Sequence, residues 1–188
     1  DYIPDAAIPL LINYLKYWEF NLVIVKNRNT KHGDFRMLSE GVHQISVNNS
    51  ANPYRFLITI IHEIAHLVAF KDFGYFIKPH GKEWKSCYQK LITPFLKPEI
   101  FPQKLLDLLV HHFKNPKAST DSDFNLVIEL NKFDPETEKN YIFELDLGTI
   151  FEIHNSRKFV LGSMRKKRYE CKEILTQRKY LFSPHAQV

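Results

Sequence analysis

Residues 53–70 read PYRFLITIIHEIAHLVAF, a stretch that would be apolar on nearly every side of a helix. Asn52 and Pro53 are residue types favoured at a helix start, so a helix is predicted from Pro53 to about Phe70. A helix that is apolar all round belongs in the core of a domain. The stretch is too short and too polar to indicate a membrane span, and no membrane partner is predicted.

Three ionisable side chains interrupt this apolar helix: His62, Glu63 and His66. The histidines are four residues apart and share one helical face, so both imidazoles can reach one ion. Zinc binds neutral imidazole nitrogens, and a metal compensates for the cost of burying these groups. Glu63 is rotated by about 100° from His62, where it can act as general base on a zinc-activated water. The alternative is a pair of core histidines bonded to the backbone.

A catalytic zinc usually has three protein ligands and one open position. His80 is the best candidate for the third ligand, because Pro79 and Gly81 predict a bend that can aim its imidazole back across the site. A second helix is predicted to begin there and to run from Gly81 to Ile92. An exposed loop histidine is the alternative interpretation of His80. The rival ligands are Asp72, Glu83, His32 and His43, the last of which is better suited to filling one face of a strand.

The segments HEIAH (62–66) and HGKEW (80–84), with Trp18 and short predicted strands upstream, resemble the SprT-like zinc metalloprotease family. That family includes the Spartan proteases of DNA–protein crosslink repair. The resemblance covers roughly residues 5 to 95. It implies a zincin-like core, one catalytic Zn²⁺ held by His62, His66 and His80, and peptide-bond hydrolysis with Glu63 as general base.

The elements around the buried helix indicate an α+β fold. Apolar residues at helical spacing predict a helix over 5–18, and a third helix is predicted from Pro102 to about Lys114. Short extended stretches at 21–25, 33–39 and 42–47, separated by turn residues, predict a small antiparallel sheet.

A polar stretch with one proline predicts a linker at 116–123, which separates a metalloprotease core at 1–115 from a small basic β module at 124–188. Asn155-Ser156 and Thr176-Gln177 are expected hairpin turns. The strands predicted in the module are 124–130, 141–147, 149–153, 158–161, 168–173 and 179–182. Many SprT-like proteins end in a four-cysteine zinc ribbon. Because this module has only Cys171, it is expected to be a degenerate ribbon without its metal.

The excess positive charge lies at the end of the chain. Residues 151–188 carry nine bases and three acids, a net +6, whereas residues 1–150 carry 17 bases and 18 acids, a net −1. Such a segment suggests a polyanionic partner, nucleic acid or anionic lipid, or a solvated basic surface without one. The resemblance to the SprT-like family implies DNA as that partner. The candidate nucleic-acid-binding residues are Arg165, Lys166, Lys167 and Arg168. Interleaved aromatics Phe159, Tyr169 and Tyr180 are expected to stack bases.

The leading hypothesis is a zinc-dependent endopeptidase that acts on protein or peptide substrates, including proteins bound to nucleic acid. A second hypothesis is a nucleic-acid-binding protein with a structural or vestigial zinc site, and a third is a metal-dependent hydrolase of non-protein amides. Cys87 and Cys171 are too few for a disulfide framework. The first ten residues show no basic segment of a secretory signal, so a cytoplasmic location is expected, at the nucleoid if DNA binds.

Overall fold

Helix α2 (Pro53–Phe73) organises the N-terminal part of the computed structural model, which describes residues 2–28, 31–50, 52–135, 139–153, 155–184 and 186–188. The helix begins as predicted, because the Asn52 side chain accepts a hydrogen bond from the Arg55 amide at 3.0 Å. It ends at Gly74, whose φ of 76° favours glycine. Its apolar side chains are buried on most sides of the helix, which confirms the predicted core helix. No helix among the described residues is long and apolar enough to cross a membrane.

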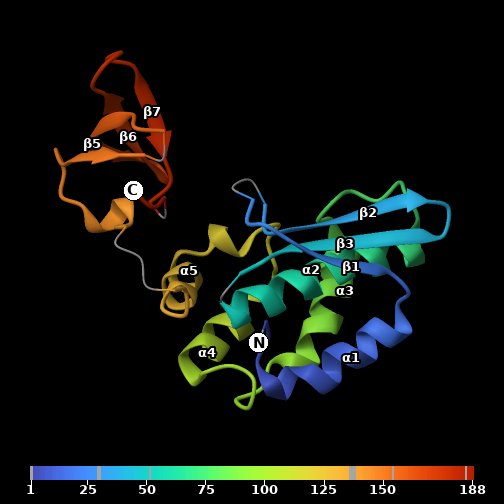
Figure 1. Cartoon of the computed structure of the whole chain (residues 1–188). Helices are drawn as coiled ribbons and strands as arrows, with labels where there is room; N and C mark the ends of the chain where they lie inside the picture. Colours follow the sequence, from blue (N-terminus) through green and yellow to red (C-terminus); the bar gives the residue numbers. More distant parts are fainter. Residues whose placement is uncertain (1, 29–30, 51, 136–138, 154, 185) are drawn as a thin grey trace. The chain divides into compact units, whose positions relative to one another are not determined.

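A three-stranded sheet packs against α2 (Figure 1). Its strands are β1 (Asn21–Val25), β2 (Gly33–Ser39) and β3 (Val42–Asn48), in the spatial order β1-β3-β2. The predicted strands are confirmed, but the antiparallel sheet is only partly correct, because β1 pairs with β3 in parallel. Strand periodicity does not encode direction, and the segment after β1 carries the chain to the opposite side of β3. Among the strands that the structure describes, β2 lies at the edge of this sheet and pairs only with β3.

The helices predicted around α2 are present. They are α1 (Ile8–Tyr17), preceded by a 3₁₀ turn at Asp5–Ala7, α3 (Lys82–Ile92) and α4 (Gln103–His112). Together with the sheet they enclose one apolar core, whose largest fully buried side chains include Trp84, Tyr88, Phe95 and Phe101. The α+β class is therefore confirmed.

Residues 124–130 form a helix where a strand was predicted. Helix α5 (Phe124–Asn131) begins at Asp123, whose carboxylate caps the Leu126 amide. Leu126 and Leu130, four residues apart, are fully buried in the N-terminal core. An apolar run of this length fits a strand as well as a helix, so sequence alone could not distinguish them.

The chain divides into two units, Asp1–Pro135 and Glu136–Val188. The division falls after α5, whereas the predicted linker is at 116–123. That segment instead lies within the N-terminal unit and contains a 3₁₀ turn, Thr120–Ser122. Its polar composition correctly indicates an exposed loop, but the core contacts of α5 extend the first unit beyond it.

The C-terminal unit is an antiparallel sheet in the order β4-β5-β6-β7. Its strands are β4 (Ile150–Glu152), β5 (Lys158–Arg165), β6 (Arg168–Glu173) and β7 (Lys179–Phe182). These strands are confirmed, but the strand predicted at 141–147 is wrong: Ile142–Glu144 is a 3₁₀ turn. Ser156 and Gln177 have φ values of 61° and 60°, as tight turns between strands require. The core contains Ile142, Phe151, Phe159, Leu161 and Cys171.

Candidate metal centre

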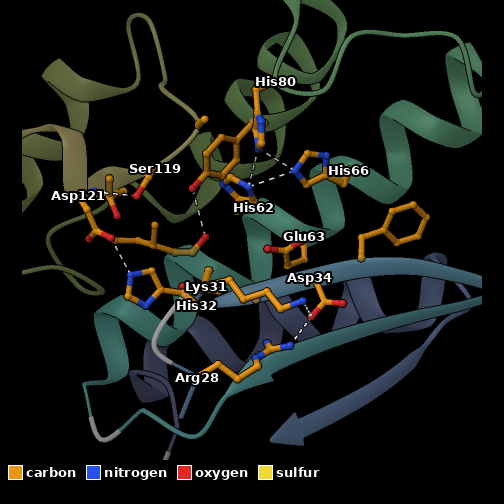
Figure 2. Close-up of a pocket in the computed structure, with 17 residues that line it drawn as sticks. Arg28, Lys31, His32, Asp34, His62, Glu63, His66, His80, Ser119 and Asp121 are labelled. Carbon is orange, nitrogen blue, oxygen red and sulfur yellow. Dashed lines mark hydrogen bonds and ion pairs between the residues drawn. The ribbon is translucent and has the colours of Figure 1, made fainter. Parts of the chain in front are cut away.

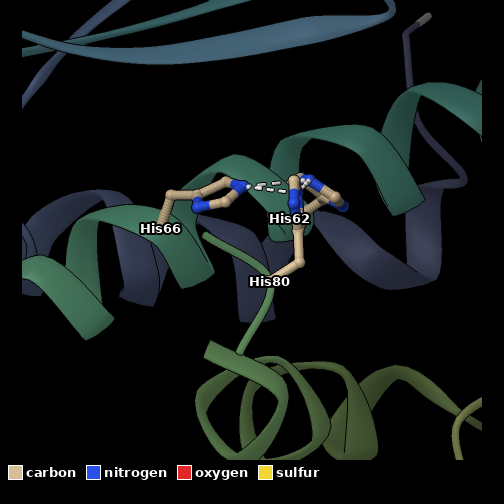
Figure 3. A group of neighbouring side chains, drawn as sticks. All are labelled: His62, His66 and His80. Atoms are coloured by element: carbon tan, nitrogen blue, oxygen red, sulfur yellow. Dashed lines mark hydrogen bonds between the residues drawn. The ribbon is translucent and has the colours of Figure 1, made fainter. Parts of the chain in front are cut away.

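Three imidazoles converge on one point in the N-terminal unit (Figure 3). His62 and His66 extend from one face of α2, and His80 reaches them from the turn before α3. The Nε2 atoms are 3.2 Å apart between His62 and His66, 3.1 Å between His66 and His80, and 3.3 Å between His62 and His80. No other group of three His, Cys, Asp or Glu side chains suited to a metal is found among the described residues.

The spacing of these nitrogens fits a tetrahedral metal ion. Ligand nitrogens 2.0–2.1 Å from zinc lie about 3.3 Å from one another when the coordination is tetrahedral. Burial lowers the pKa of His62 well below its usual value and that of His66 to about 4, and it also lowers the pKa of His80. All three rings are therefore neutral near pH 7, the form that binds metal.

The turn before α3 has the geometry needed to direct His80 inward. His80 has a φ of 58°, which is uncommon for a residue other than glycine. The Gly81 amide donates a hydrogen bond to the Lys78 carbonyl at 2.8 Å, which closes the turn. A Cβ at Gly81 would lie 2.8 Å from that carbonyl oxygen, so glycine is required there. The bend predicted around Pro79 and Gly81 is therefore present.

The Trp84 ring packs against all three imidazoles. Its ring is fully buried, and its centroid lies 4.7 Å from that of His62, 5.3 Å from His66 and 4.6 Å from His80. Tyr88, one turn further along α3, contacts His62 at 5.3 Å and donates a hydrogen bond to the Ile58 carbonyl at 3.2 Å. These aromatic contacts restrict the ring orientations, which is how supporting residues tune a metal site. Sequence reasoning did not identify Tyr88.

Glu63 lies against the start of β2. A Cβ at Gly33 would lie 2.8 Å from both Cγ and Oε1 of Glu63, so a larger residue there would displace the Glu63 side chain. Burial raises the pKa of Glu63 to about 8, and the charge of Asp34 adds to the rise. A hydrogen bond from the Phe35 backbone and the charges of Arg28 and Lys31 oppose it. A cation held by the histidines would also favour the carboxylate form.

Glu63 and the three histidines line one cavity of about 540 Å³ (Figure 2). Arg28, Lys31, His32 and the first residues of β2 form one wall, and residues 118–121 contribute another part of the lining. Asp34 accepts hydrogen bonds from Arg28, Lys31, Arg36 and Ser46. Burial alone would raise the pKa of Asp34, but these partners hold it far below its usual value. Sequence reasoning missed this charged cluster, because it depends on the pairing of β2 with β3.

The rival ligands do not join the histidine cluster. His43 is buried between Phe35 and Phe70, with ring centroids 5.8 and 5.6 Å away, and fills a strand face as expected. His32 lines the cavity, but its Nε2 atom lies 2.9 Å from Asp121 Oδ2. Asp72 is exposed to solvent. Glu83 forms an ion pair with Lys82, in which Oε1 lies 3.8 Å from Nζ.

The predicted nucleic-acid-binding residues lie at the exposed β5–β6 turn of the C-terminal unit. Arg165 and Lys179 both bond Glu170 at 2.8 Å. Among the described residues, no acid forms an ion pair with the remaining three bases of the run, which are Lys166, Lys167 and Arg168.

The burial of Phe159 contradicts its predicted base-stacking role, whereas stacking on Tyr169 and Tyr180 stays a prediction. Phe159 is fully buried, and Tyr169 and Tyr180 pack against the same interior. Side chains alternate between the faces of a strand, so the exposed bases Arg168 and Lys172 point away from Tyr169. These two bases therefore lie on the opposite face of β6 from Tyr169.

An α+β domain in which a buried helix carries two histidines and a glutamate, with a third histidine beside them, has a donor set that could hold a metal ion. Residues 22–100 match the model of the SprT-like family, which confirms the resemblance seen in the HEIAH and HGKEW segments. Over these residues the chain is therefore similar to the SprT-like family. The match includes the three-stranded sheet, α2, the His80 turn and α3, and it ends before α4. No solved structure matches the chain significantly.

Proposed function

We propose that this protein is a zinc-dependent metalloendopeptidase in which His62, His66 and His80 hold one Zn²⁺ ion. The observation that carries the proposal is the triangle of Nε2 atoms with sides of 3.1–3.3 Å, next to a buried carboxylate in the same cavity. A zinc ion bound there supplies Lewis-acid polarisation of a carbonyl and makes water acidic near neutral pH.

Glu63 acts as the general base in this proposal. Its carboxylate takes a proton from the attacking water as the water oxygen bonds to the peptide carbon. The C–N bond then breaks, and the same proton passes to the departing amine nitrogen. The position of Gly33 supports this role, because the lack of a side chain there lets the β2 backbone lie directly against Glu63.

The substrate is an extended polypeptide that pairs with the free edge of β2. Gly33, Asp34 and Phe35 line the same cavity as the three histidines, so a chain added to this edge would lie beside them. Main-chain hydrogen bonds to an unpaired strand recognise polypeptide of any sequence, while side-chain pockets add selectivity.

The decisive test uses the full chain and its Glu63→Gln variant. Metal analysis should find one zinc ion in each, and unfolded casein should be cleaved only by the unmodified protein. Because a general base contributes about 100- to 10,000-fold, the variant should lose at least 100-fold in rate. His111→Ala, at an exposed histidine of α4, serves as the control. Full activity of Glu63→Gln would exclude this mechanism.

The C-terminal unit is proposed to hold DNA, so that the substrates include proteins bound or crosslinked to it. Lys166, Lys167 and Arg168, which form no ion pair with an acid in the described part of the chain, support contacts to phosphates. Such contacts are independent of sequence and weaken with salt. A cytoplasmic, nucleoid-associated location follows from this proposal.

The same basic turn also favours a second candidate function, a DNA-binding protein with a structural or vestigial zinc site. A zinc-loaded protein that binds DNA but cleaves no protein with or without DNA would support this alternative over the peptidase.

A further inference from the structure

Residues 115–123, here called the strap, are fixed over the N-terminal unit by side chains along their length. The Lys85 ammonium donates a hydrogen bond to Asn115 at 2.7 Å, and His112 Nδ1 lies 3.1 Å from the Asp123 carboxylate. Between these points, the Asp121 amide donates to the Ser119 hydroxyl at 3.1 Å. The strap lies outside the range of the SprT-like match. The hydrogen bonds at its two ends hold the strap in a defined position, so it is not a flexible linker.

The strap reaches the wall of the metal cavity through one hydrogen-bonded pair, here called the clasp. His32 Nε2 lies 2.9 Å from Asp121 Oδ2, and Figure 2 shows the two side chains facing each other at one side of the cavity. Ser119, Thr120 and Asp121 line the cavity on the strap side, and His32 lines it on the β2 side. The clasp therefore joins two parts of the cavity wall.

The position of the clasp along β2 determines what it obstructs. His32 immediately precedes Gly33, the residue that lies against Glu63. A polypeptide paired with β2 has its scissile bond near Glu63, so the chain that continues past the start of β2 meets the clasp. An extended chain advances about 3.3 Å per residue, so only a few residues fit before that point.

We infer that the clasp between His32 and Asp121 closes one end of the substrate cleft and must open before the interior of a long polypeptide can enter. This inference rests on the proposed function, because it assumes that polypeptide lies along β2. Short peptides and chain ends enter with the clasp closed, whereas an internal segment needs it open. His32 and Asp121 thus determine the length of chain accepted on one side of the scissile bond.

The energetics make opening feasible. The side chains of His32 and Asp121 are 45% and 47% exposed, and a solvent-exposed pair of this kind shifts an equilibrium by about two- to five-fold. Asp121 also lies 3.5 Å from Arg55 of α2, so it keeps an anchor when His32 is lost. Substituting His32 therefore removes the clasp while leaving the Arg55 contact of the strap.

The test measures binding, so that it does not depend on turnover. The zinc-loaded full chain carries Glu63→Gln, and two fluorescent probes are compared: unfolded casein and a six-residue peptide blocked at both ends. Adding His32→Ala should raise the ratio of association rates, casein over peptide, by about two- to five-fold. The matched control His111→Ala should leave that ratio unchanged. An unchanged ratio in His32→Ala would overturn the inference.

A second arm holds the clasp shut. The pair His32→Cys and Asp121→Cys, in the same background, is joined by a short dithiol-reactive linker that a reductant removes. Casein association should fall at least ten-fold relative to the peptide and recover on reduction, while the single-cysteine variants treated alike should not change. Equal casein binding in the linked and reduced forms, failure of the pair to link, or binding of neither probe would each contradict the inference. Cleavage by the Glu63→Gln protein would instead contradict the proposed function alone.

Discussion

The candidate metal centre and the basic turn of the C-terminal unit use charge in opposite ways. At the centre, Glu63 is buried and the three imidazoles are half-buried, and each is restricted by packing, as Glu63 is by Gly33 and the imidazoles are by Trp84. At the β5–β6 turn, the bases are exposed to solvent. Buried groups are strongly coupled to their neighbours, whereas exposed charges act weakly and almost independently. Single substitutions should therefore have large effects at the centre and small, additive effects at the turn.

The largest expected effect comes from removing one imidazole. His66→Ala leaves two nitrogens of the triangle, and zinc affinity should fall by more than about 100-fold, since losing even a supporting residue costs 10- to 100-fold. Competition with a fluorescent chelator measures the affinity. His43→Ala is the matched control, because this histidine is buried in the same unit but lies between Phe35 and Phe70. Equal zinc affinity in His66→Ala and the unmodified protein would remove the basis of the comparison.

Trp84 tests whether packing, and not only ligation, sets the properties of the centre. Trp84→Ala leaves a cavity under three rings and should destabilise the N-terminal unit by about 3–5 kcal/mol. Zinc affinity should fall by about 10- to 100-fold, because the imidazoles are no longer held in place. Trp84→Phe retains part of the contact and should recover most of the affinity. Urea unfolding and chelator competition separate the two effects, and unchanged affinity in a folded Trp84→Ala protein would show that the tryptophan only fills space.

The same contrast explains what the sequence could reveal. His62, Glu63 and His66 are polar residues inside an apolar period, and Pro79 and Gly81 flank His80, so local pattern located the residues of the candidate centre. Trp84 was visible only as part of a motif, because its contact with all three rings depends on how α3 packs on α2.

Residues 115–135 show where local pattern is insufficient. The strap has the composition of a linker, and nothing in that composition indicates that Asp121 lies 2.9 Å from His32, 89 residues earlier. Leu126 and Leu130 are compatible with strand and helix alike until the core that buries them is known. The parallel pairing of β1 was missed for a related reason, since residue type does not determine strand direction.

Glu173 lies in the C-terminal unit, like the exposed basic turn, but its carboxylate is buried and hydrogen-bonded, like the groups of the candidate centre. Hydrogen bonds from Arg157 and Thr176 lower its pKa to about 2. The folded unit therefore favours the carboxylate more than the unfolded chain does, and this contribution to stability is complete above the ordinary glutamate pKa of about 4.5. It should be lost progressively as the pH falls from there toward 2. Glu173→Gln should weaken this acid dependence in thermal melts, whereas Glu152→Gln, at an exposed edge strand, should not. Equal acid dependence in the two variants would assign the effect to other groups.

The smallest expected effects are those of single bases at the turn. Each phosphate contact contributes about 0.9 to the slope of log affinity against log salt, so losing one should weaken DNA binding about five-fold at 0.15 M salt. Lys166→Ala and Lys167→Ala should each show this change, and the double variant should show the sum of both changes in slope. Lys16→Ala, at an exposed lysine of α1, is the control. Fluorescence anisotropy with duplexes of two unrelated sequences measures the binding of all four variants. The loss should be the same for both duplexes, because phosphate contacts carry no sequence information. A loss confined to one duplex, or a double variant far weaker than the product of the singles, would show that the turn is a coupled site like the metal centre and not a set of independent charges.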